Sequence, residues 1–410
     1  MRMKRVVITG RGAVSPFGTG VAKLVDNVWA GASAIRTMPE WENIGGMKSR
    51  IAAPVPDFDA RDLLPRHLRR SMGKMAQYAA IAAIEAIRDA SLSEDLLHSG
   101  KTGVSVGSTT GSPTAYFDFY RKFLPDMAIG EIKSGEFFQM MGHSCAANIC
   151  LATGIRGEQW APASACTSSS QAIGLGYLLI QTGRQEIMLC GGADEVHVSV
   201  TGVFDLLRAA STSNATPERA PRPFSADRDG VVCGGGSGIL VLEDYDSARR
   251  RGANIYAEIL GFGNVNDSDH IAHPNKDPMA RAMLAALDEA GVSPADIDYV
   301  NAHATGTEQG DKAEAAAVFQ TVGGSCPVSS FKGHIGHTLG AAGALESIIL
   351  LEMLRRQEII PTRNLQEADP ECTIVNLIKT IEKHRICTVI KNNFALGGVN
   401  TALVFRKLDS

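Results

Sequence analysis

The sequence predicts an α/β fold made of two similar halves, and three observations lead to this prediction. The same order of strand-like and helix-like segments occurs twice along the 410 residues. Within each half, strands alternate with helices, a pattern typical of mixed sheets with helices on both faces. One long apolar helix in each half is rich in glycine and alanine, and such helices can pack closely between two sheets.

Each half opens with a strand that runs into a glycine turn, in "RVVITGRGAV" and, from Ile255, in "IYAEILGFGNV". A helical stretch follows at residues 75–93 in the first half and at residues 279–293 in the second, both with apolar residues three to four positions apart. Strands ending in Gly and Thr come next, in "GVSVGSTTG" and "IDYVNAHATGT". The same three elements therefore open both halves.

An extended segment, a turn of small residues and a long apolar helix then follow, in "QWAPASACTSSSQAIGLGYLLIQTG" and in "CPVSSFKGHIGHTLGAAGALESIILLEMLRRQ". Apolar strands close the halves, in "EIMLCGGADEV" with "GILVLEDY" and in "TVIKNNFALGG" with "NTALVFRKL". We place the halves at residues 1–250 and 251–410. Their two central helices are expected to be buried, and the shared interior is expected to make one cooperative unit.

The composition argues against two classes of partner. The formal net charge is −4 with 20% charged residues, whereas nucleic-acid-binding proteins are usually basic. No apolar run approaches the ~18 residues that span a membrane, and the N-terminal "MRMKRVVITGRG" lacks the pattern of a signal peptide. We therefore expect a soluble, cytoplasmic protein that binds neither nucleic acid nor membrane.

Eight cysteines are scattered along the chain without a CxxC pair, so most are expected to be small buried apolar residues. Cys166 differs because it lies where a strand meets the start of a long apolar helix. The helix dipole there is expected to lower the pKa of the thiol, and the free N–H groups of the first turn can bind an oxyanion. The alternative is a structural cysteine beside N-capping Ser and Thr residues.

Ionisable groups at matching loops of the second half favour a catalytic role for Cys166. Lys332 and His337 stand at the corresponding turn, and His303 stands in the loop after an earlier strand. Catalytic groups commonly gather at loop ends over a rigid α/β scaffold. His334 lies three residues before His337 and resembles half of a metal pair, but no third ligand has a matching spacing. We therefore predict no metal site.

Four motifs carry a resemblance to a known family: "SACTSSS", "HATGTEQGD", "FKGHIGHTLGAAGALES" and "NNFALGGVNTALVF". The chain resembles the elongating β-ketoacyl-acyl carrier protein synthases, which are type I/II condensing enzymes of the thiolase superfamily. "RVVITGRGAVSPFG", "PFSADRDG" and "CGGADEV" support the resemblance, which covers essentially the whole chain in the family's order. It implies a thiolase-like fold, with duplicated α/β halves in α-β-α-β-α layers and two buried central helices.

The resemblance also implies a role for each motif residue. Cys166 resembles the nucleophile that receives the acyl chain, and the backbone N–H groups of Cys166 and Leu396 resemble the oxyanion hole. The remaining site residues form a set with separate implied roles: condensing histidines (His303, His337), an orienting lysine (Lys332), the carboxylate beneath it (Glu346), and threonines that bind the phosphopantetheine arm (Thr305, Thr307).

The implied reaction is a decarboxylative Claisen condensation. An acyl chain passes from an acyl carrier protein to Cys166, and a malonyl carrier then loses its carboxylate to give an enolate that attacks the acyl group. The phosphopantetheine arrives on the carrier protein, so no further cofactor is expected. The family forms dimers, which implies a homodimer or a heterodimer with a related subunit.

Two departures from the family pattern concern the acyl pocket. Leu396 replaces a gating Phe, and Thr110 stands where a bulky aliphatic residue often lines the acyl tunnel. These changes favour a specialised synthase for polyketide, polyene or unusual fatty chains, although harmless drift is an equal explanation. Ala304 replaces the usual Gly in "HATGT" and is expected to matter little.

Three other functions remain alternatives. A non-catalytic partner subunit, such as a chain-length factor, lacks the nucleophile, whereas this chain has Cys166 and both histidines. A degradative thiolase usually carries a second cysteine in the C-terminal Gly-rich loop, but "NNFALGGVN" has none. A cysteine hydrolase does not need Lys332 together with two histidines.

A basic run provides a candidate docking surface for an acidic carrier protein. It lies in "LPRHLRRSMGK" and contains Arg66, Arg69, Arg70 and Lys74. An ordinary solvated helix start is an equally good interpretation of this run.

Overall fold

The computed structural model describes residues 3–56 and 58–408, and its main strands form one 12-stranded sheet whose two halves, called the first and second sheets below, have the same topology. The strand order is β1-β8-β7-β5-β6 in the first half and β9-β16-β15-β10-β11 in the second, where β13 adds to the edge. In each half, neighbouring strands among the first three in this order pair antiparallel, and the third, fourth and fifth strands pair parallel. The strands are β1 (Val6–Ser15), β5 (Thr102–Gly107), β6 (Gln159–Trp160), β7 (Ile187–Asp194), β8 (Gly236–Asp244), β9 (Ala257–Asn266), β10 (Tyr299–Asn301), β11 (Pro327–Ser329), β13 (Asn376–Leu377), β15 (Thr388–Phe394) and β16 (Val399–Arg406).

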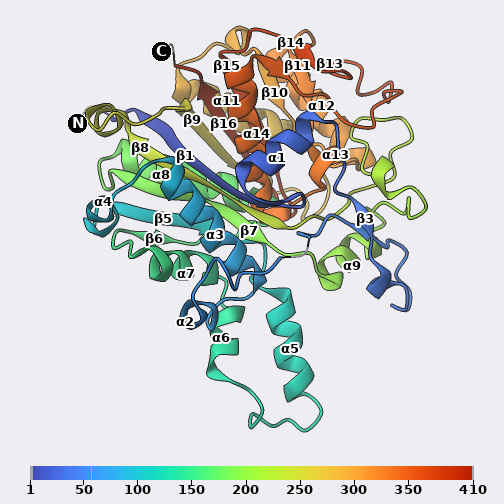
Figure 1. Cartoon of the computed structure of the whole chain (residues 1–410). Coiled ribbons are helices and arrows are strands. Elements are labelled where there is room, and N and C mark those ends of the chain that lie inside the picture. The colour runs from blue at the N-terminus through green and yellow to red at the C-terminus, as the bar shows by residue number, and fades with distance from the viewer. Residues whose placement is uncertain (1–2, 57, 409–410) are drawn as a thin grey trace.

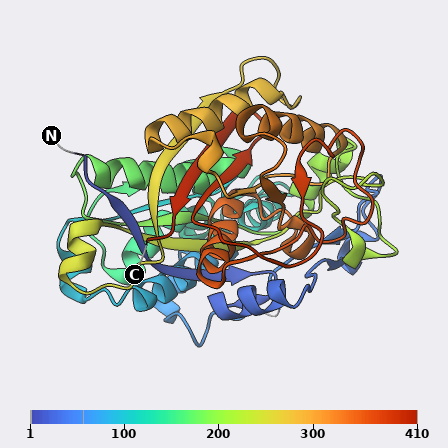
Figure 2. The ribbon, with the colours of Figure 1, turned by 90° about the horizontal axis from the view of Figure 1, so that it is seen from above.

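Two long helices lie between the sheets (Figures 1 and 2). These are α8 (Ser168–Gln181) and α14 (Ala342–Arg356), and every residue of α14 from Ala342 to Leu354 is buried. One apolar core joins both helices to strands of both halves, as with Leu240 of β8 and Leu403 of β16. The small side chains that the sequence places in these helices explain why the helices fit between the sheets.

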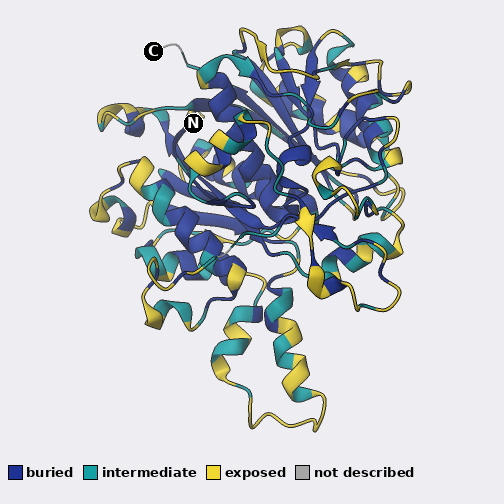
Figure 3. Ribbon diagram, turned by 45° about the vertical axis from the view of Figure 1, so that its right-hand side comes forward, coloured by how far each residue is buried: buried dark blue, intermediate teal, exposed yellow. Residues whose placement is uncertain are grey.

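Outer helices complete five layers. α3 (Lys74–Asp89) and α7 (Ser144–Thr153) share an apolar core with the outer face of the first sheet, and α11 (Lys276–Ala290) and α12 (Glu308–Val322) share one with the second. The order is therefore helix, sheet, helix, sheet, helix, with a blue buried interior in Figure 3. The predicted duplicated α/β fold with two buried central helices is confirmed.

The glycines that open each half have a different role from the one expected. They do not form a turn, because β1 continues through them to Ser15. A Cβ atom on Gly12 would lie 2.0 Å from the carbonyl oxygen of Ala82 in α3, and one on Gly263 would lie 1.9 Å from that of Ala282 in α11. Both glycines therefore let an outer helix pack directly on the strand backbone.

The first half carries the longer excursions. Residues 108–158 include α5 (Pro113–Phe123) and α6 (Ser134–Met140), which project from the body and expose apolar side chains (Figures 1 and 3). After β7 comes α9 (Val198–Leu206), which leads toward β8. The remaining helices and strands are short: β2 (Gly18–Thr19), α1 (Val21–Trp29), β3 (Arg36–Thr37), β4 (Ile51–Ala52), α2 (Arg66–Arg69), α4 (Glu94–His98), α10 (Tyr245–Arg250), α13 (Lys332–Ile335), β12 (Glu358–Ile359) and β14 (Glu382–Lys383).

The two halves meet at their first strands. β1 pairs with β9, residue Val6 opposite Ile259, and this pairing joins all the main strands into one continuous sheet. The chain passes from the first half to the second between α10 and β9. The division at residue 250 and the cooperative unfolding of both halves stay predictions. Among the described helices, none has the length and apolar content needed to cross a membrane.

Candidate active site

Cys166 lies in a tight turn at the buried start of α8. The turn is a short 3-10 helix, Ala165–Thr167, in which Ala165 has a φ of 50°. The second half repeats it before α14, where Leu339 has a φ of 54° and Gly340 stands at the position of Cys166. A non-glycine residue in this left-handed region costs on the order of 1–3 kcal/mol, and such strain is concentrated at functional sites.

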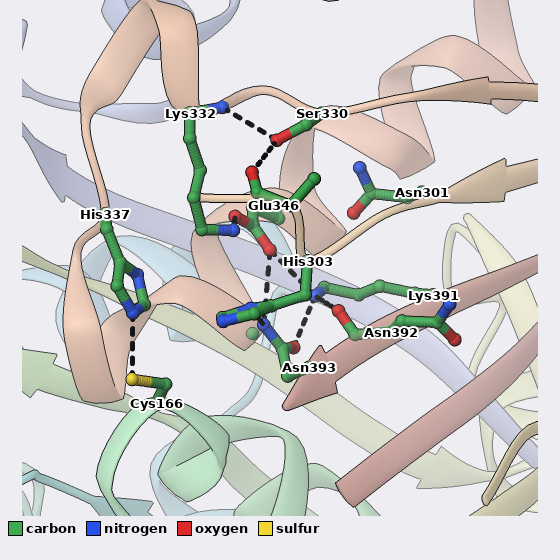
Figure 4. Close-up of polar contacts among 12 residues, drawn as sticks. Cys166, Asn301, His303, Ser330, Lys332, His337, Glu346, Lys391, Asn392 and Asn393 are labelled. Atoms are coloured by element: carbon green, nitrogen blue, oxygen red, sulfur yellow. Dashed lines mark hydrogen bonds and ion pairs between the residues drawn. The ribbon is translucent and has the colours of Figure 1, made fainter. Parts of the chain in front are cut away.

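The second half brings two imidazoles to this sulfur (Figure 4). The His337 Nε2 atom lies 2.8 Å from the Cys166 Sγ atom. The ring of His303, from the loop between β10 and α12, lies edge-to-face against His337 with 5.1 Å between ring centroids. The Cys166 sulfur and one ring nitrogen of each histidine all lie within 4.8 Å of one another, and all three residues are buried. The structure therefore brings these predicted site residues together.

Burial keeps both rings neutral. It lowers the pKa of His337 to about 3, and the Lys332 ammonium acts in the same direction. The pKa of His303 is lowered well below its usual value, again by burial first and Lys332 second. Two neutral imidazoles can accept or donate a hydrogen bond without bringing a positive charge into the site.

The thiol of Cys166 differs from the sequence-based expectation. Burial raises its pKa to about 12, with the Lys332 charge acting in the opposite direction. A helix terminus contributes about 2 kcal/mol at most, which is roughly 1.5 pKa units and less than the effect of burial. The resting pair is therefore a thiol beside a neutral imidazole, and the thiol must lose its proton as it reacts.

Beneath the rings lies a fully buried ion-pair cluster in which two lysines share one carboxylate. The Glu346 Oε1 atom lies 2.6 Å from Lys332 Nζ, and Oε2 lies 2.9 Å from Lys391 Nζ. Burial would raise the pKa of Glu346, but the two ammonium groups outweigh it and lower this pKa to about 2. Lys332 stands at the start of α13, Glu346 on α14 and Lys391 on β15, so three elements meet here.

Sequence reasoning missed Lys391 and Asn393. Lys391 Nζ donates to Asn393 Oδ1 at 2.5 Å, and the Asn393 Nδ2 atom lies 3.3 Å from His303 Nδ1. The signal was present in "TVIKNNFALGG", where a lysine interrupts an apolar strand that the fold must bury. A buried lysine almost always has a charged partner, so this strand predicts an ion pair.

The predicted threonines and Leu396 line two cavities that meet at Cys166. A cavity of about 590 Å³ contains Cys166, His303 and His337 together with Thr305 and Thr307. The two threonine hydroxyls are 3.2 Å apart.

A second cavity, of about 550 Å³, is bordered by Cys166, the exposed Thr110 and apolar residues such as Phe117 and Val203. Cys166 and Leu396 line both cavities. The Leu396 N–H has no acceptor within the described part of the chain, which leaves it free for a ligand. Its pairing with the Cys166 N–H as an oxyanion hole stays a prediction.

The cluster of donor atoms does not favour a metal ion. A thiol and two imidazoles are suitable zinc ligands, but the ammonium groups of Lys332 and Lys391 below them repel a cation. His334 does not belong to this cluster of ligand atoms; its buried ring lies with Nδ1 2.9 Å from the Ala32 carbonyl. The absence of a metal site stays a prediction, which the charge of the two ammonium groups supports.

The predicted docking run lies apart from both cavities. Three of its residues are exposed: Arg66 on α2, Arg70 directly after α2, and Lys74 at the start of α3. Arg69 is half-buried and donates to the Leu64 carbonyl at 3.0 Å, so it also holds the local turn. Arg66, Arg70 and Lys74 together form the docking patch.

The sequence of this chain matches one protein family along most of its length, and it is similar to individual members of known function. Residues 3–248 match the family described as Beta-ketoacyl synthase, N-terminal domain, and residues 256–366 match its C-terminal domain. The chain is 36% identical to 3-oxoacyl-[acyl-carrier-protein] synthase 1 of Haemophilus influenzae over 99% of this chain and 100% of the relative.

Two solved structures have the same fold. A β-ketoacyl synthase from Burkholderia phymatum superimposes with a TM-score of 0.96 at 42% identity, over 99% of this chain and 100% of that one. A ketosynthase bound to a hexaketide and to a type II polyketide synthase acyl-carrier protein gives a TM-score of 0.91 at 29% identity, with the same coverage.

Proposed function

The chain belongs to the β-ketoacyl synthase family, and from this premise we propose that it condenses malonyl-acyl carrier protein with an acyl chain held on Cys166. The products are carbon dioxide and a β-ketoacyl-acyl carrier protein, as in fatty acid or polyketide chain elongation. The observation that carries the proposal is the 2.8 Å contact between the Cys166 sulfur and the His337 ring. A second neutral ring, His303, lies at the same cavity.

In the first step the acyl group moves to the enzyme. The Cys166 sulfur attacks the carbonyl carbon of an acyl thioester, and the thiol proton passes through His337 Nε2 to the departing carrier thiol. A new thioester forms on Cys166 as the old one breaks. Backbone N–H groups of Cys166 and Leu396 stabilise the oxyanion of the tetrahedral intermediate.

In the second step a malonyl carrier enters and loses its carboxylate. The electron pair of the broken carbon–carbon bond moves onto the thioester oxygen. The N–H groups of His303 and of His337, once the proton of the His337 ring resides on Nε2, stabilise that charge. The resulting carbon nucleophile attacks the acyl-Cys166 carbonyl, and the Cys166 sulfur leaves as a thiolate. It then takes up one proton from solvent water, the proton that the overall reaction consumes. Burial and the Lys332 ammonium keep both rings neutral, and Glu346 holds that ammonium in place beneath them.

The cavities fit the two parts of the substrate. The phosphopantetheine arm of the carrier enters the cavity lined by Thr305 and Thr307, and the acyl chain occupies the apolar cavity lined by Thr110 and Leu396. This arm, delivered by the carrier, supplies the only prosthetic chemistry that the reaction needs. Leu396 and Thr110 mark a preference for specialised acyl chains. The expected assembly is a homodimer or a heterodimer with a related subunit, and the expected location is the cytoplasm.

The alternatives have less support. A non-catalytic partner subunit has no use for the contact between Cys166 and His337. A thiolase carries its second cysteine in the C-terminal Gly-rich loop, whereas "NNFALGGVN" has none and Cys387 lies just before β15. The cysteine that does lie near the site, Cys233, pairs with His337 through the backbone and comes from the first half. The condensing reaction accounts for the thiol and both rings together.

Intact-mass analysis after incubation with acyl carriers of varied chain length tests the proposal. We expect a mass gain equal to the acyl group in the wild type and no gain in Cys166→Ala. Subsequent addition of malonyl carrier should remove the acyl group and release carbon dioxide. A wild-type protein that gains no mass from any acyl donor would contradict the proposal.

A further inference from the structure

Lys391 lies on β15, wholly buried, and links the carboxylate cluster to the ring of His303 through Asn393 (Figure 4). We propose that Lys391 and Asn393 are positioning residues that hold the His303 ring with its proton on Nε2, ready to donate to the enolate oxygen. The inference rests on the proposed condensing function and assigns a task to two residues outside the motif roles described above.

The orientation of the Asn393 amide follows from its donors. The Lys391 ammonium can only donate, and it lies 2.5 Å from Asn393 Oδ1. The Ser170 hydroxyl lies 2.6 Å from the same oxygen. With the oxygen held from two sides, the amide NH₂ group must face the other way, toward His303 Nδ1 at 3.3 Å and Glu346 Oε2 at 3.4 Å.

This orientation determines the tautomer of His303. An amide NH₂ group donates hydrogen bonds, so the Nδ1 atom that it faces must present a lone pair. The proton of the neutral ring then resides on Nε2. Because Asn393 occupies Nδ1, Nε2 is the nitrogen left to act toward Cys166 and His337, whose donor atoms lie within 4.8 Å of a His303 nitrogen.

Lys391 is itself fixed by charge. Its ammonium lies 2.9 Å from Glu346 Oε2 and 3.4 Å from the carbonyl of Asn392, with no exposed side-chain surface. Glu346 also holds Lys332, and the carboxylate of Glu314 lies beside the same cluster, where it accepts the backbone N–H of His303 at 2.8 Å. A change at position 391 therefore reaches His303 through the Asn393 amide, and also through the charge of the ammonium, which helps to lower the pKa of His303.

Asn393→Asp is the sharpest variant. The new carboxylate keeps acceptors for Lys391 and Ser170 but presents an oxygen to His303 Nδ1, which must then carry the proton. Lys391→Met removes the ammonium at similar side-chain volume and leaves the amide free to rotate. Asn301→Asp is the matched control, because it introduces the same buried charge on β10, where Asn301 Nδ2 faces the Ser329 carbonyl at 3.4 Å and not His303.

Three readouts are compared: acylation of Cys166 by intact mass, carbon dioxide release from malonyl carrier, and the tautomer of His303 by ¹⁵N-histidine NMR. For both test variants we expect acylation within about threefold of wild type and decarboxylation about 10²-fold slower, the loss typical of one missing oxyanion donor. The wild-type spectrum should show His303 with Nε2–H, and Asn393→Asp should move the proton to Nδ1. The control should change neither the ratio of the two rates nor the His303 signal.

The outcomes separate the inference from the proposed function. A wild-type protein that neither acylates Cys166 nor decarboxylates malonyl carrier overturns the function. An active wild type whose His303 carries Nδ1–H overturns the inference, and so does an equal loss of both rates in the two variants. If either variant does not fold, the His303 tautomer of the wild type and the two rates of the remaining variant still test the inference.

Discussion

At the scale of single residues, the chemistry depends on how burial shifts proton affinities in opposite directions. Burial raises the pKa of the Cys166 thiol to about 12 and lowers that of His337 to about 3. Both groups are therefore uncharged at neutral pH, and the low-dielectric site strengthens every hydrogen bond to a charge that develops there. The resting site therefore contains a neutral thiol and a neutral imidazole instead of a thiolate–imidazolium ion pair.

The lowered histidine pKa values predict the acid side of the pH profile. A ring with a depressed pKa stays neutral as the pH falls through 6.5, so protonation of His337 begins to matter only as the pH approaches about 3. We expect the rate of malonyl decarboxylation by the acyl-free enzyme to stay flat between about pH 7.5 and 5.5. The measurement is carbon dioxide release in buffers of constant ionic strength, and an inflection near the ordinary histidine pKa would contradict it.

Leu396 separates the two cavities and predicts a change in chain preference. Because Leu396 and Cys166 line both spaces, Leu396→Phe should narrow the passage from the thiol to the apolar cavity. We expect acylation by an eight-carbon donor to slow about tenfold relative to acetyl, the size of effect that a few methylenes produce in a pocket.

Intact-mass time courses with both donors measure this ratio. Leu207→Phe is the control, since Leu207 lines only the first cavity among the two. An unchanged ratio in Leu396→Phe would show that position 396 does not gate the acyl chain.

At the scale of the elements, the close packing of a helix on strand glycines recurs in both halves. Gly12 against α3 and Gly263 against α11 leave no room for a Cβ atom next to a helix carbonyl. The same device at equivalent strands shows that the duplication extends to packing detail. It also sets the depth at which the outer helices lie, and through them the position of the sheets around α8 and α14.

Alanine at either position should destabilise the protein. Gly12→Ala forces α3 away from β1, and overpacking of this kind costs about 1–3 kcal/mol. The matched control is Gly202→Ala in α9, where a Cβ meets nothing within 4 Å and alanine favours the helix by about 0.5–1 kcal/mol. Urea unfolding midpoints compare the two, and a Gly12→Ala midpoint at or above that of wild type would refute the packing argument.

At the scale of the whole molecule, the order of elements was predictable because hydrophobic periodicity repeats along the chain. The convergence of Cys166, His303 and Lys332 followed from the resemblance, since the two halves had to face each other for these loops to meet. The glycine contacts were not predictable, because a glycine pair in a strand looks the same as one in a turn. The Lys391–Asn393 link and the raised thiol pKa depend on burial, which only the three-dimensional packing determines.

The docking patch yields the last prediction, because it separates recognition of the carrier protein from the chemistry at Cys166. Arg66, Arg70 and Lys74 line neither cavity, so reversing their charges should leave the reacting groups unchanged. Each exposed charge contributes up to about 1 kcal/mol at moderate salt; Arg66→Glu with Arg70→Glu and Lys74→Glu should therefore raise KM for acyl carrier protein substrates about 10- to 100-fold. Acyl pantetheine without the protein should keep its KM, and Arg250→Glu on α10 should behave as wild type. Added salt should weaken carrier binding to the wild type and not to the triple variant. If the wild type and the triple variant have equal KM values for the carrier, the docking patch does not bind the carrier protein and is an ordinary solvent-exposed surface.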